Sequence, residues 1–243
     1  MINLTDQQLK DINESFNWKT TTKLPDGRLL GNGKKKKFKN KDIDLFKSYF
    51  KRLNIKQCLE VGCAEGYNTV ELAKICQFVI ATDVRPRNII GAMIRQWVLK
   101  LDNIEFHCLD LNTLENENPL TDIKMDIIYH TGVLYHLTNP IKHLKYIASI
   151  TDNLFLATRC YDKKSDIKLL IGQMVKYENT FKQYRVNEKP FTWKRSFAGI
   201  TDYSTWLHKD EIKDILHHVG FKKVILLEET RSYCPRVIFA VTK

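Results

Sequence analysis

Two stretches of the sequence hold residue types that can do chemistry. In CLEVGCAEGYNTVELAK (58–74), an apolar run leads into a loop bounded by Gly62 and Gly66 and then into a helix-like pattern. Glycine in such a loop permits positive φ and lets the backbone approach a ligand closely. In YHTGVLYHL (129–137), His130 and His136 flank Gly132. These histidines can bind a metal, transfer a proton or help to shape a loop.

The first loop excludes some ligands. A dinucleotide loop has the pattern GxGxxG, but Ala64 and Tyr67 occupy two of those glycine positions. No Gly-Lys-Ser/Thr follows, which excludes a P-loop. In and just after the second stretch, His130, His136 and His143 have no acid or thiol at ligand spacing, so we predict no metal site and expect His143 on the surface of its helix.

The elements that position these loops alternate along the chain. Short apolar runs predict strands, and apolar residues at helical spacing predict helices between them. The predicted strands are 57–61, 78–83, 104–110, 125–130 and 152–159, and the predicted helices are 67–76, 87–100 and 140–150. Such alternation favours an α/β fold with a mainly parallel sheet. A further helix (209–219) and two strands (222–228 and 235–242) predict an antiparallel hairpin at or near the sheet edge.

Two segments stand outside this alternation. Helical spacing at 5–16 and 41–53, around a loop with Pro-Asp-Gly and Gly-Asn-Gly, predicts an N-terminal helical extension over 1–53. The remaining domain, 54–243, contains an insertion after the fifth strand at about 160–206. We expect a helix over 165–177, then an aromatic and basic stretch packed over the sheet's carboxyl edge.

Charge and composition limit the possible binding partners and the cellular compartment. The net charge is +11, and six lysines within Lys34–Lys41 supply more than half of it. That run can bind nucleic-acid phosphates or be a solvated loop. No apolar run approaches the roughly 18 residues of a membrane helix, and the N-terminus is unlike a signal peptide. The six cysteines lack CxxC spacing, so we expect buried reduced thiols and a cytoplasmic protein.

The glycine loop resembles the first motif of class I S-adenosylmethionine-dependent methyltransferases, acid-x-Gly-x-Gly-x-Gly. Glu60, Gly62, Ala64 and Gly66 occupy its positions, with Ala64 departing from the middle glycine. The resemblance implies a Rossmann-like sheet with helices on both faces and S-adenosyl-L-methionine as cofactor. It places an acid on the ribose hydroxyls and another near the adenine. The cofactor residues implied are Glu60, Gly62, Cys63, Ala64, Gly66, Asp83, Val84, Asp110, Leu111 and Gly132.

The second stretch is similar to one subgroup of that superfamily. Gly132-Val133-Leu134-Tyr135-His136, Pro140 and the lead-in FNWKTTTKLPDGRLLGNG resemble enzymes that modify wobble uridine in tRNA. Many relatives with this loop act on small molecules or sugars. We therefore expect O-methyl transfer to a small anionic molecule or saccharide. The alternative is a tRNA methyl or carboxymethyl transferase that binds RNA through Lys34–Lys41. The oligomeric state stays open.

Two residues are candidates for catalysis. Tyr135 can place its ring near the positive sulfur, and His136 can accept a proton from a hydroxyl nucleophile. A histidine that only hydrogen-bonds the backbone is the alternative. Basic residues beside aromatics in the insertion suit an anionic or stacked acceptor, or else pack the insertion onto the core. The candidate acceptor residues are Tyr184, Arg185, Trp193, Arg195 and Tyr203.

Overall fold

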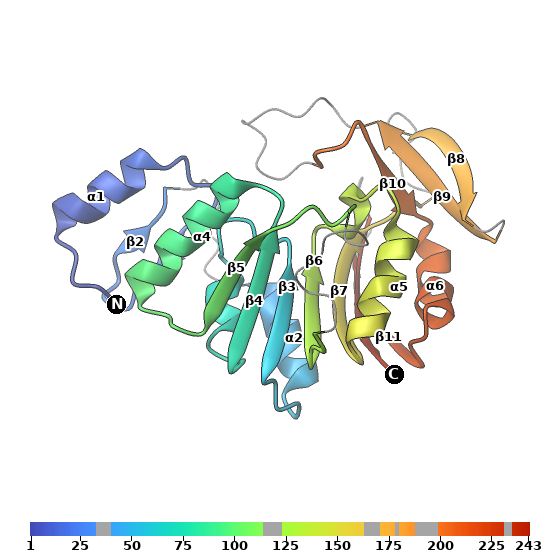
Figure 1. Ribbon diagram of the computed structural model, residues 1–243, viewed down its shortest axis with the longest axis horizontal. Helices are drawn as coiled ribbons and strands as arrows, with labels where there is room; N and C mark the ends of the chain where they lie inside the picture. Colours follow the sequence, from blue (N-terminus) through green and yellow to red (C-terminus); the bar gives the residue numbers. More distant parts are fainter. Residues whose placement is uncertain (33–39, 114–122, 163–170, 178–179, 188–198, 231–234) are drawn as a thin grey trace. The chain divides into compact units, whose positions relative to one another are not determined.

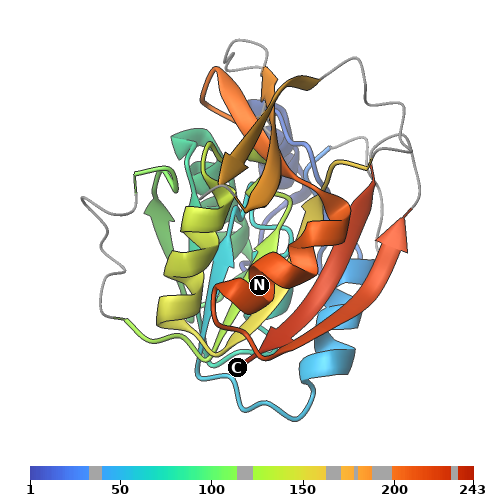
Figure 2. The same cartoon turned by 90° about the vertical axis from the view of Figure 1, so that its right-hand side faces the viewer.

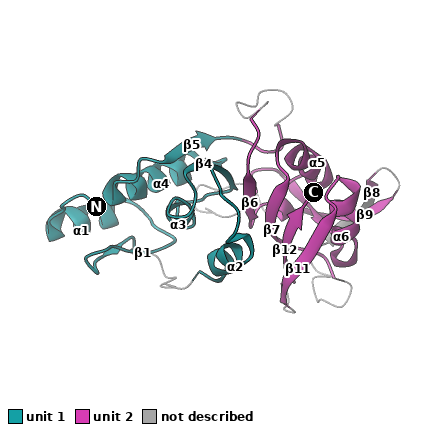
Figure 3. Cartoon of the chain, turned by 90° about the horizontal axis from the view of Figure 1, so that it is seen from below, with its two compact units in different colours: residues 1–109 teal, residues 110–243 magenta. Residues whose placement is uncertain are grey.

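The computed structural model describes residues 1–32, 40–113, 123–162, 171–177, 180–187, 199–230 and 235–243 (Figure 1). The chain divides into two compact units, Met1–Leu109 and Asp110–Lys243, coloured separately in Figure 3. Among the described residues, no helix combines the length and apolar character needed to cross a bilayer.

Unit 1 begins with the predicted N-terminal extension. Helix α1 (Asp6–Ser15) starts with a capping box in which Thr5 and Gln8 exchange hydrogen bonds. The segment expected to be loop instead contains two short antiparallel strands, β1 (Thr22–Lys23) and β2 (Leu29–Leu30). Together they lie beside α4 (Pro86–Leu99) (Figure 1). Their shared core consists of Leu4, Leu9, Trp18, Leu24, Leu30 and Val98.

The rest of unit 1 is a parallel three-stranded arrangement. Its elements are α2 (Lys41–Phe50), β3 (Gln57–Val61), α3 (Thr69–Leu72), β4 (Phe78–Asp83) and β5 (Ile104–Cys108). Strand β4 pairs in parallel with β3 on one side and with β5 on the other. Because parallel strands end at a common edge, the loops after Val61, Asp83 and Cys108 come together.

Unit 2 carries the remaining strands of the α/β domain. Strands β6 (Ile127–Thr131) and β7 (Asn153–Arg159) are parallel, with η1 (Leu134–His136) and α5 (Pro140–Ile150) between them. Helix α5 begins where Asn139 caps the main-chain N–H of Lys142, and it buries Ile141, Leu144 and Ile147 at helical spacing.

The last strands form the predicted antiparallel hairpin. β12 (Arg236–Thr242) pairs antiparallel with both β7 and β11 (Lys223–Thr230), and β11 forms the edge. Before them stand η3 (Lys209–Glu211) and α6 (Ile212–His218), where one helix was expected. Helix α6 packs against β11 (Figure 2).

The insertion forms a sheet of its own. Strands β8 (Ile171–Tyr177), β9 (Phe181–Asn187) and β10 (Tyr203–Leu207) pair antiparallel in the order β10-β9-β8. The helix expected over 165–177 is wrong for 171–177, because pairing with β9 overrides local helical spacing there. Residues 163–170 lie outside the described part of the chain.

Two further expectations need correction. The helix predicted over 67–76 is shorter, since α3 spans Thr69–Leu72. The five described cysteines are free, and Cys58, Cys63, Cys76 and Cys160 are buried as expected. Cys108 is exposed, because it ends β5 at the sheet's carboxyl edge, where a loop begins.

Candidate active site

The glycine loop of unit 1 turns back on itself directly after β3. The N–H groups of Gly62 and Cys63 both donate to the Thr82 carbonyl, at 2.9 and 2.8 Å. Gly62 and Gly66 have φ of 77°, and Ala64 has φ of 48°. A side chain at Gly66 would bring its Cβ to 2.9 Å from the Ala92 Cβ. The loop therefore needs glycine at Gly66 both for its φ and for the close approach of α4.

Asp83 ends β4 and is bound to this loop. Its Oδ2 accepts from the Ala64 N–H at 3.0 Å, and its Oδ1 accepts from the N–H of Arg85 and the side chain of Asn88, at 2.9 and 3.0 Å. Burial raises the pKa of Asp83, while these donors oppose the shift. A carboxylate offers about four acceptor positions, so roughly one remains for a ligand hydroxyl.

Glu60 lies inside unit 1, below the loop. The Thr69 hydroxyl donates to its Oε2 at 2.5 Å, and its buried Oε1 has no hydrogen-bond partner among the described residues. Burial raises the pKa of Glu60 to about 8, and the nearby Asp83 charge adds to the shift. Burial likewise raises the pKa of the Cys63 thiol. Val84 is half-buried after β4, and its carbonyl accepts a weak bond from Cys108.

A buried ion pair between Arg95 and Glu65 connects the glycine loop to the N-terminal extension. The Arg95 guanidinium donates to the Glu65 carbonyl at 2.6 Å and to the Thr20 carbonyl at 2.9 Å, and it also contacts Thr22. The Glu65 carboxylate accepts from the N–H groups of Lys19 and Thr20. Sequence reasoning missed this cluster. Its signal is a charged residue, Arg95, on the apolar stripe of α4.

In unit 2, His130 and His143 form a buried pair. Their Nε2 atoms lie 3.0 Å apart, so one ring donates and the other accepts. Burial lowers the pKa of His130 to about 4 and lowers that of His143 well below its usual value. His143 was expected on the surface of its helix, but it is buried because α5 turns it toward β6. No group of three histidine, cysteine or acidic residues suited to a metal occurs in the described ranges.

The candidate catalytic residues Tyr135 and His136 lie on one short turn of unit 2. We call this turn, from Gly132 to Thr138, the catalytic turn. Gly132, with φ of 76°, donates to the Ala157 carbonyl and opens this turn. The rings of Tyr135 and His136 have centroids 4.1 Å apart. The Arg159 guanidinium lies 5.4 Å from the centroid of the Tyr135 ring.

The predicted acceptor residues divide between two faces of the insertion sheet. Tyr184 is buried opposite Trp206, and its ring centroid lies 3.8 Å from that of Tyr161, with the two rings tilted by 39°. Arg185 points to the other face, with its guanidinium 4.1 Å from the Tyr203 ring. The set therefore cannot line one pocket. Trp193 and Arg195 lie outside the described residues.

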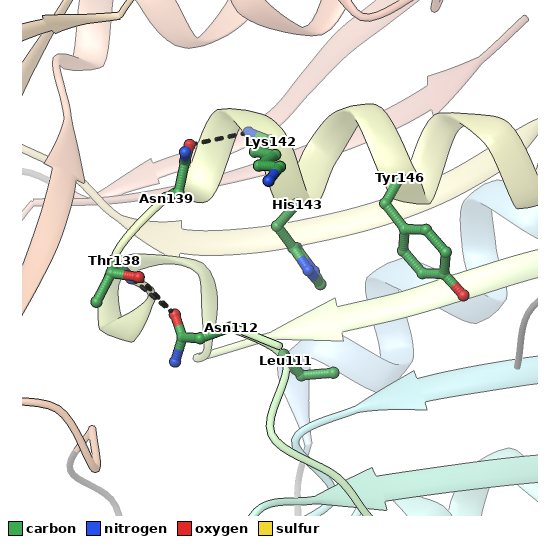
Figure 4. A pocket seen from close by; sticks show the side chains of 7 residues that line it. All are labelled: Leu111, Asn112, Thr138, Asn139, Lys142, His143 and Tyr146. Atoms are coloured by element: carbon green, nitrogen blue, oxygen red, sulfur yellow. Dashed lines mark hydrogen bonds between the residues drawn. The ribbon is translucent and has the colours of Figure 1, made fainter. Parts of the chain in front are cut away.

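Asp110 and Leu111 open unit 2 beside a small cavity. The Asp110 Oδ1 accepts from the main chain and the side chain of Asn112, at 2.9 and 3.0 Å. Asn112 in turn accepts two hydrogen bonds from Thr138, so the segment after Asp110 is tied to the end of the catalytic turn (Figure 4). Sequence reasoning missed Asn112. The cavity has a volume of about 40 Å³ and is lined by Leu111, Asn112, Thr138, Asn139, Lys142, His143 and Tyr146.

A family model described as a methyltransferase domain matches residues 54–220. The chain belongs to this methyltransferase family, and it is a class I S-adenosylmethionine-dependent enzyme. Among solved structures, the N-terminal domain of EvdMO1 in the presence of SAH and D-fucose aligns with a TM-score of 0.79. That alignment is 20% identical and covers 99% of this chain and 97% of that one.

Two other similar proteins cover less of this chain. The N-methyltransferase NodS from Bradyrhizobium japonicum WM9, in complex with S-adenosyl-L-homocysteine, aligns with a TM-score of 0.53 and 17% identity. It covers 84% of this chain and 86% of that one. The tRNA U34 carboxymethyltransferase of Syntrophotalea carbinolica (strain DSM 2380 / NBRC 103641 / GraBd1) is 32% identical over 118 residues, 47% of this chain. The match spans 35% of that relative's length.

The cofactor expected from the glycine loop is confirmed by this family membership. The left-handed turn and the unpartnered Glu60 Oε1 fit a ligand that needs close backbone contact and a buried polar group. The solved neighbours confirm the expected Rossmann-like fold, through structural likeness over nearly the whole chain.

Proposed function

We propose that the chain methylates a hydroxyl group of a small saccharide or small anionic molecule. The observation that carries this proposal is the grouping of Tyr135, His136 and Trp206 in unit 2, where strand β10 of the insertion is bonded to the catalytic turn. The Thr205 N–H donates to the Leu137 carbonyl at 2.8 Å, one residue after His136. The D-fucose present with the EvdMO1 domain, which shares this fold over 99% of the chain, supports a sugar.

The candidate cofactor residues divide into those that shape the backbone and those that offer acceptors. In unit 1, Gly62, Cys63, Ala64 and Gly66 form the left-handed turn, Glu60 and Asp83 offer carboxylate oxygens, and Val84 offers apolar surface. In unit 2, we assign Asp110 and Leu111 to the adenine and Gly132 to the start of the catalytic turn. When bound, S-adenosyl-L-methionine supplies a methyl group already activated on a sulfonium.

The residues of the turn then orient the acceptor. Alignment of a nucleophile in a near-attack geometry can supply much of the rate. We assign His136 to accept the hydroxyl proton, since an imidazole nitrogen can act as a general base. We propose that the half-buried Tyr135 ring faces the positive sulfur of the cofactor and attracts it through its π electrons.

A second candidate is modification of tRNA. The 32% identity to a tRNA U34 carboxymethyltransferase favours it, although that match spans about a third of the relative. Lys34 to Lys37, the proposed phosphate contacts, lie outside the described residues. Neutralising these four lysines would weaken RNA binding and flatten its salt dependence by about 0.7 per lost contact.

One experiment separates the two candidates. Isotopically labelled S-adenosylmethionine is incubated with the protein and D-fucose, sugar nucleotides, phosphorylated metabolites or total tRNA, and products are read by mass spectrometry. We expect labelled O-methyl product in a saccharide or small-anion pool, with turnover hardly changed in the four-lysine variant. Label confined to tRNA, and lost in that variant, would contradict the proposal.

A further inference from the structure

Strand β10 and the residue after it carry three buried polar side chains in alternate positions. Ser204 is 0% exposed, Trp206 is 6% exposed and His208 is 7% exposed. Ser204 Oγ, Trp206 Nε1 and His208 Nε2 have no hydrogen-bond partner among the residues that the structure describes. We call these three residues the β10 stripe.

The stripe lies on one face of the insertion sheet. Ser204 is paired opposite Val186 and Trp206 opposite Tyr184, so these four side chains share a face. The His208 ring continues the row, with its centroid 6.1 Å from that of Tyr184 and 5.6 Å from that of Tyr161. The same face meets the catalytic turn, because the Tyr135 ring stands edge-on to Trp206 at 5.6 Å.

Hydrogen bonds fix the stripe along both edges of β10. Strand β9 pairs with one edge. On the other edge, the Thr205 hydroxyl donates to the Thr138 carbonyl at 2.7 Å, and the Tyr161 N–H donates to the Leu207 carbonyl at 2.9 Å. The three polar atoms are therefore held in place by backbone that is tied to the catalytic turn.

Burial of these atoms without partners opposes folding. A buried donor loses the hydrogen bonds that it makes with water in the unfolded chain, and nothing in the described fold replaces them. Three such groups in alternate positions on one strand form an ordered array rather than isolated packing faults. Local conflicts of this kind concentrate at functional sites.

The chemistry of the array selects its ligand. The Trp206 Nε1 can only donate, and the Ser204 hydroxyl can donate or accept. The Asp210 N–H donates to His208 Nδ1 at 3.3 Å, which leaves the proton of the neutral ring on Nε2. The stripe thus presents N–H and O–H groups without a fixed charge. This set suits the oxygens of a neutral molecule that carries several hydroxyl groups.

We infer that the β10 stripe binds the hydroxyl groups of a neutral polyhydroxylated ring, and so selects the acceptor. Successive side chains on one face of a strand stand about 7 Å apart, so the three residues contact different hydroxyls. The half-buried rings of Tyr135 and Tyr161 cover the stripe in this structure, and their rotation would admit the ring. The inference rests on the proposed function and narrows it to neutral saccharides and related polyols.

The test compares folding with binding in Ser204→Ala and Trp206→Phe. Ser204→Ala deletes only the polar atom, whereas Trp206→Phe also replaces the indole with a smaller ring. Because Ser204 Oγ has no partner in the free fold, the melting temperature of Ser204→Ala should stay equal to or above the wild-type value, while Trp206→Phe should lose some stability through the space that it leaves. Ligand-observed NMR with D-fucose, D-glucose, L-rhamnose and myo-inositol, at saturating S-adenosyl-L-homocysteine, should show about tenfold weaker binding of the preferred ring in each variant. Affinity for S-adenosyl-L-homocysteine should not change.

Two substitutions serve as controls. Trp97→Phe makes the same chemical change at an exposed position of α4 and should leave both readouts unchanged. Thr205→Val deletes a buried hydroxyl that has a partner, so its melting temperature should fall. Should either stripe variant fail to fold, the other still decides the outcome, since each deletes a separate atom.

The outcomes separate the stripe from the proposed function. Methyl transfer from labelled S-adenosylmethionine to the same four probes is measured in separate samples that contain no S-adenosyl-L-homocysteine. If the wild type methylates a probe but the variants bind it equally well, the stripe is wrong and the proposed function stands. A marked fall in the melting temperature of Ser204→Ala would give the Ser204 hydroxyl a structural role and overturn the inference. A wild type that binds D-glucuronate tenfold more tightly than every neutral probe, or binds none of the four, also overturns the inference.

Discussion

The main-chain N–H of Ala64 donates a hydrogen bond to Asp83 Oδ2 at 3.0 Å. The carboxylate that ends β4 therefore holds the turn that follows β3, and it accepts hydrogen bonds from three donors within unit 1. The Asp83 side chain thus both shapes the glycine loop and is the candidate contact to the ribose.

Asp83→Ala should weaken the binding of S-adenosyl-L-homocysteine by about 1.5–3 kcal/mol, the usual contribution of a hydrogen bond to a charged group. Isothermal titration calorimetry measures the change. Asp102→Ala, at an exposed position, is the matched control and should bind normally. An unchanged affinity in a folded Asp83→Ala protein would remove Asp83 from the cofactor site.

Gly66→Ala should destabilise unit 1 more than Gly27→Ala does. Both positions have positive φ, which costs an L residue roughly 1–2 kcal/mol. At Gly27 a new Cβ meets nothing within 4 Å, whereas at Gly66 it meets Ala92 at 2.9 Å. Urea unfolding of the two variants isolates the steric part as their difference. Equal losses of stability would show that α4 moves aside freely.

Glu60 should make the fold less stable as the pH rises. Its pKa is raised to about 8 in the folded state, from a usual value of 4.5, so the folded chain holds a proton that the unfolded chain has released. This contribution is fully present below pH 4.5 and is lost as the pH approaches 8. Glu60→Gln mimics the protonated form, so its stability relative to wild type should increase between pH 5 and 8. Parallel stability curves for the two proteins would contradict the buried, protonated carboxyl.

The histidine pair should act in the opposite direction, on the acid side. The pKa of His130 is lowered to about 4 and that of His143 lies well below its usual value, so the unfolded chain takes up protons first as the pH falls. Their contribution is present above pH 6.5 and is lost from there toward pH 4. The double variant His130→Leu/His143→Leu removes both partners of the hydrogen bond. We expect its denaturation midpoint to vary less with pH across this range than that of the wild type. The same pH dependence in both proteins would argue against the prediction.

His136→Asn tests the candidate base. Loss of a general base reduces turnover by about 10²–10⁴-fold, while cofactor affinity should hardly change because the base acts in the transition state. The wild-type rate should also rise with pH, because a general base acts only in its deprotonated form. Single-turnover assays with the identified acceptor measure both effects. Near-normal turnover would leave catalysis to positioning alone.

Local signals predicted most of the α/β domain. Helix α5 was predicted at its observed bounds, because Asn139, Pro140 and the apolar spacing after them act locally. Family membership likewise confirms the cofactor read from the glycine loop. Strand β8 was missed because its conformation depends on pairing with β9, a contact that local spacing does not encode.

Local sequence patterns also could not predict which face of the insertion sheet each side chain occupies. Whether Tyr184 and Arg185 face the same side depends on strand register, which the sequence pattern did not reveal. His143 was placed on the surface because its partner, His130, is contributed by a different element. In each case the deciding contact is tertiary.

The bonds between Arg95 and the Thr20 segment also impose an order on synthesis. Seventy-five residues separate Thr20 from Arg95, so the N-terminal extension leaves the ribosome well before its guanidinium partner exists. At 5–20 residues per second this interval lasts roughly 4–15 s. During that time the Thr20 and Thr22 oxygens must be hydrated or held by other contacts. The Thr20 segment thus completes its native hydrogen bonds only after a partner made later in the chain is present, and α4 must be translated before the glycine loop is fully braced.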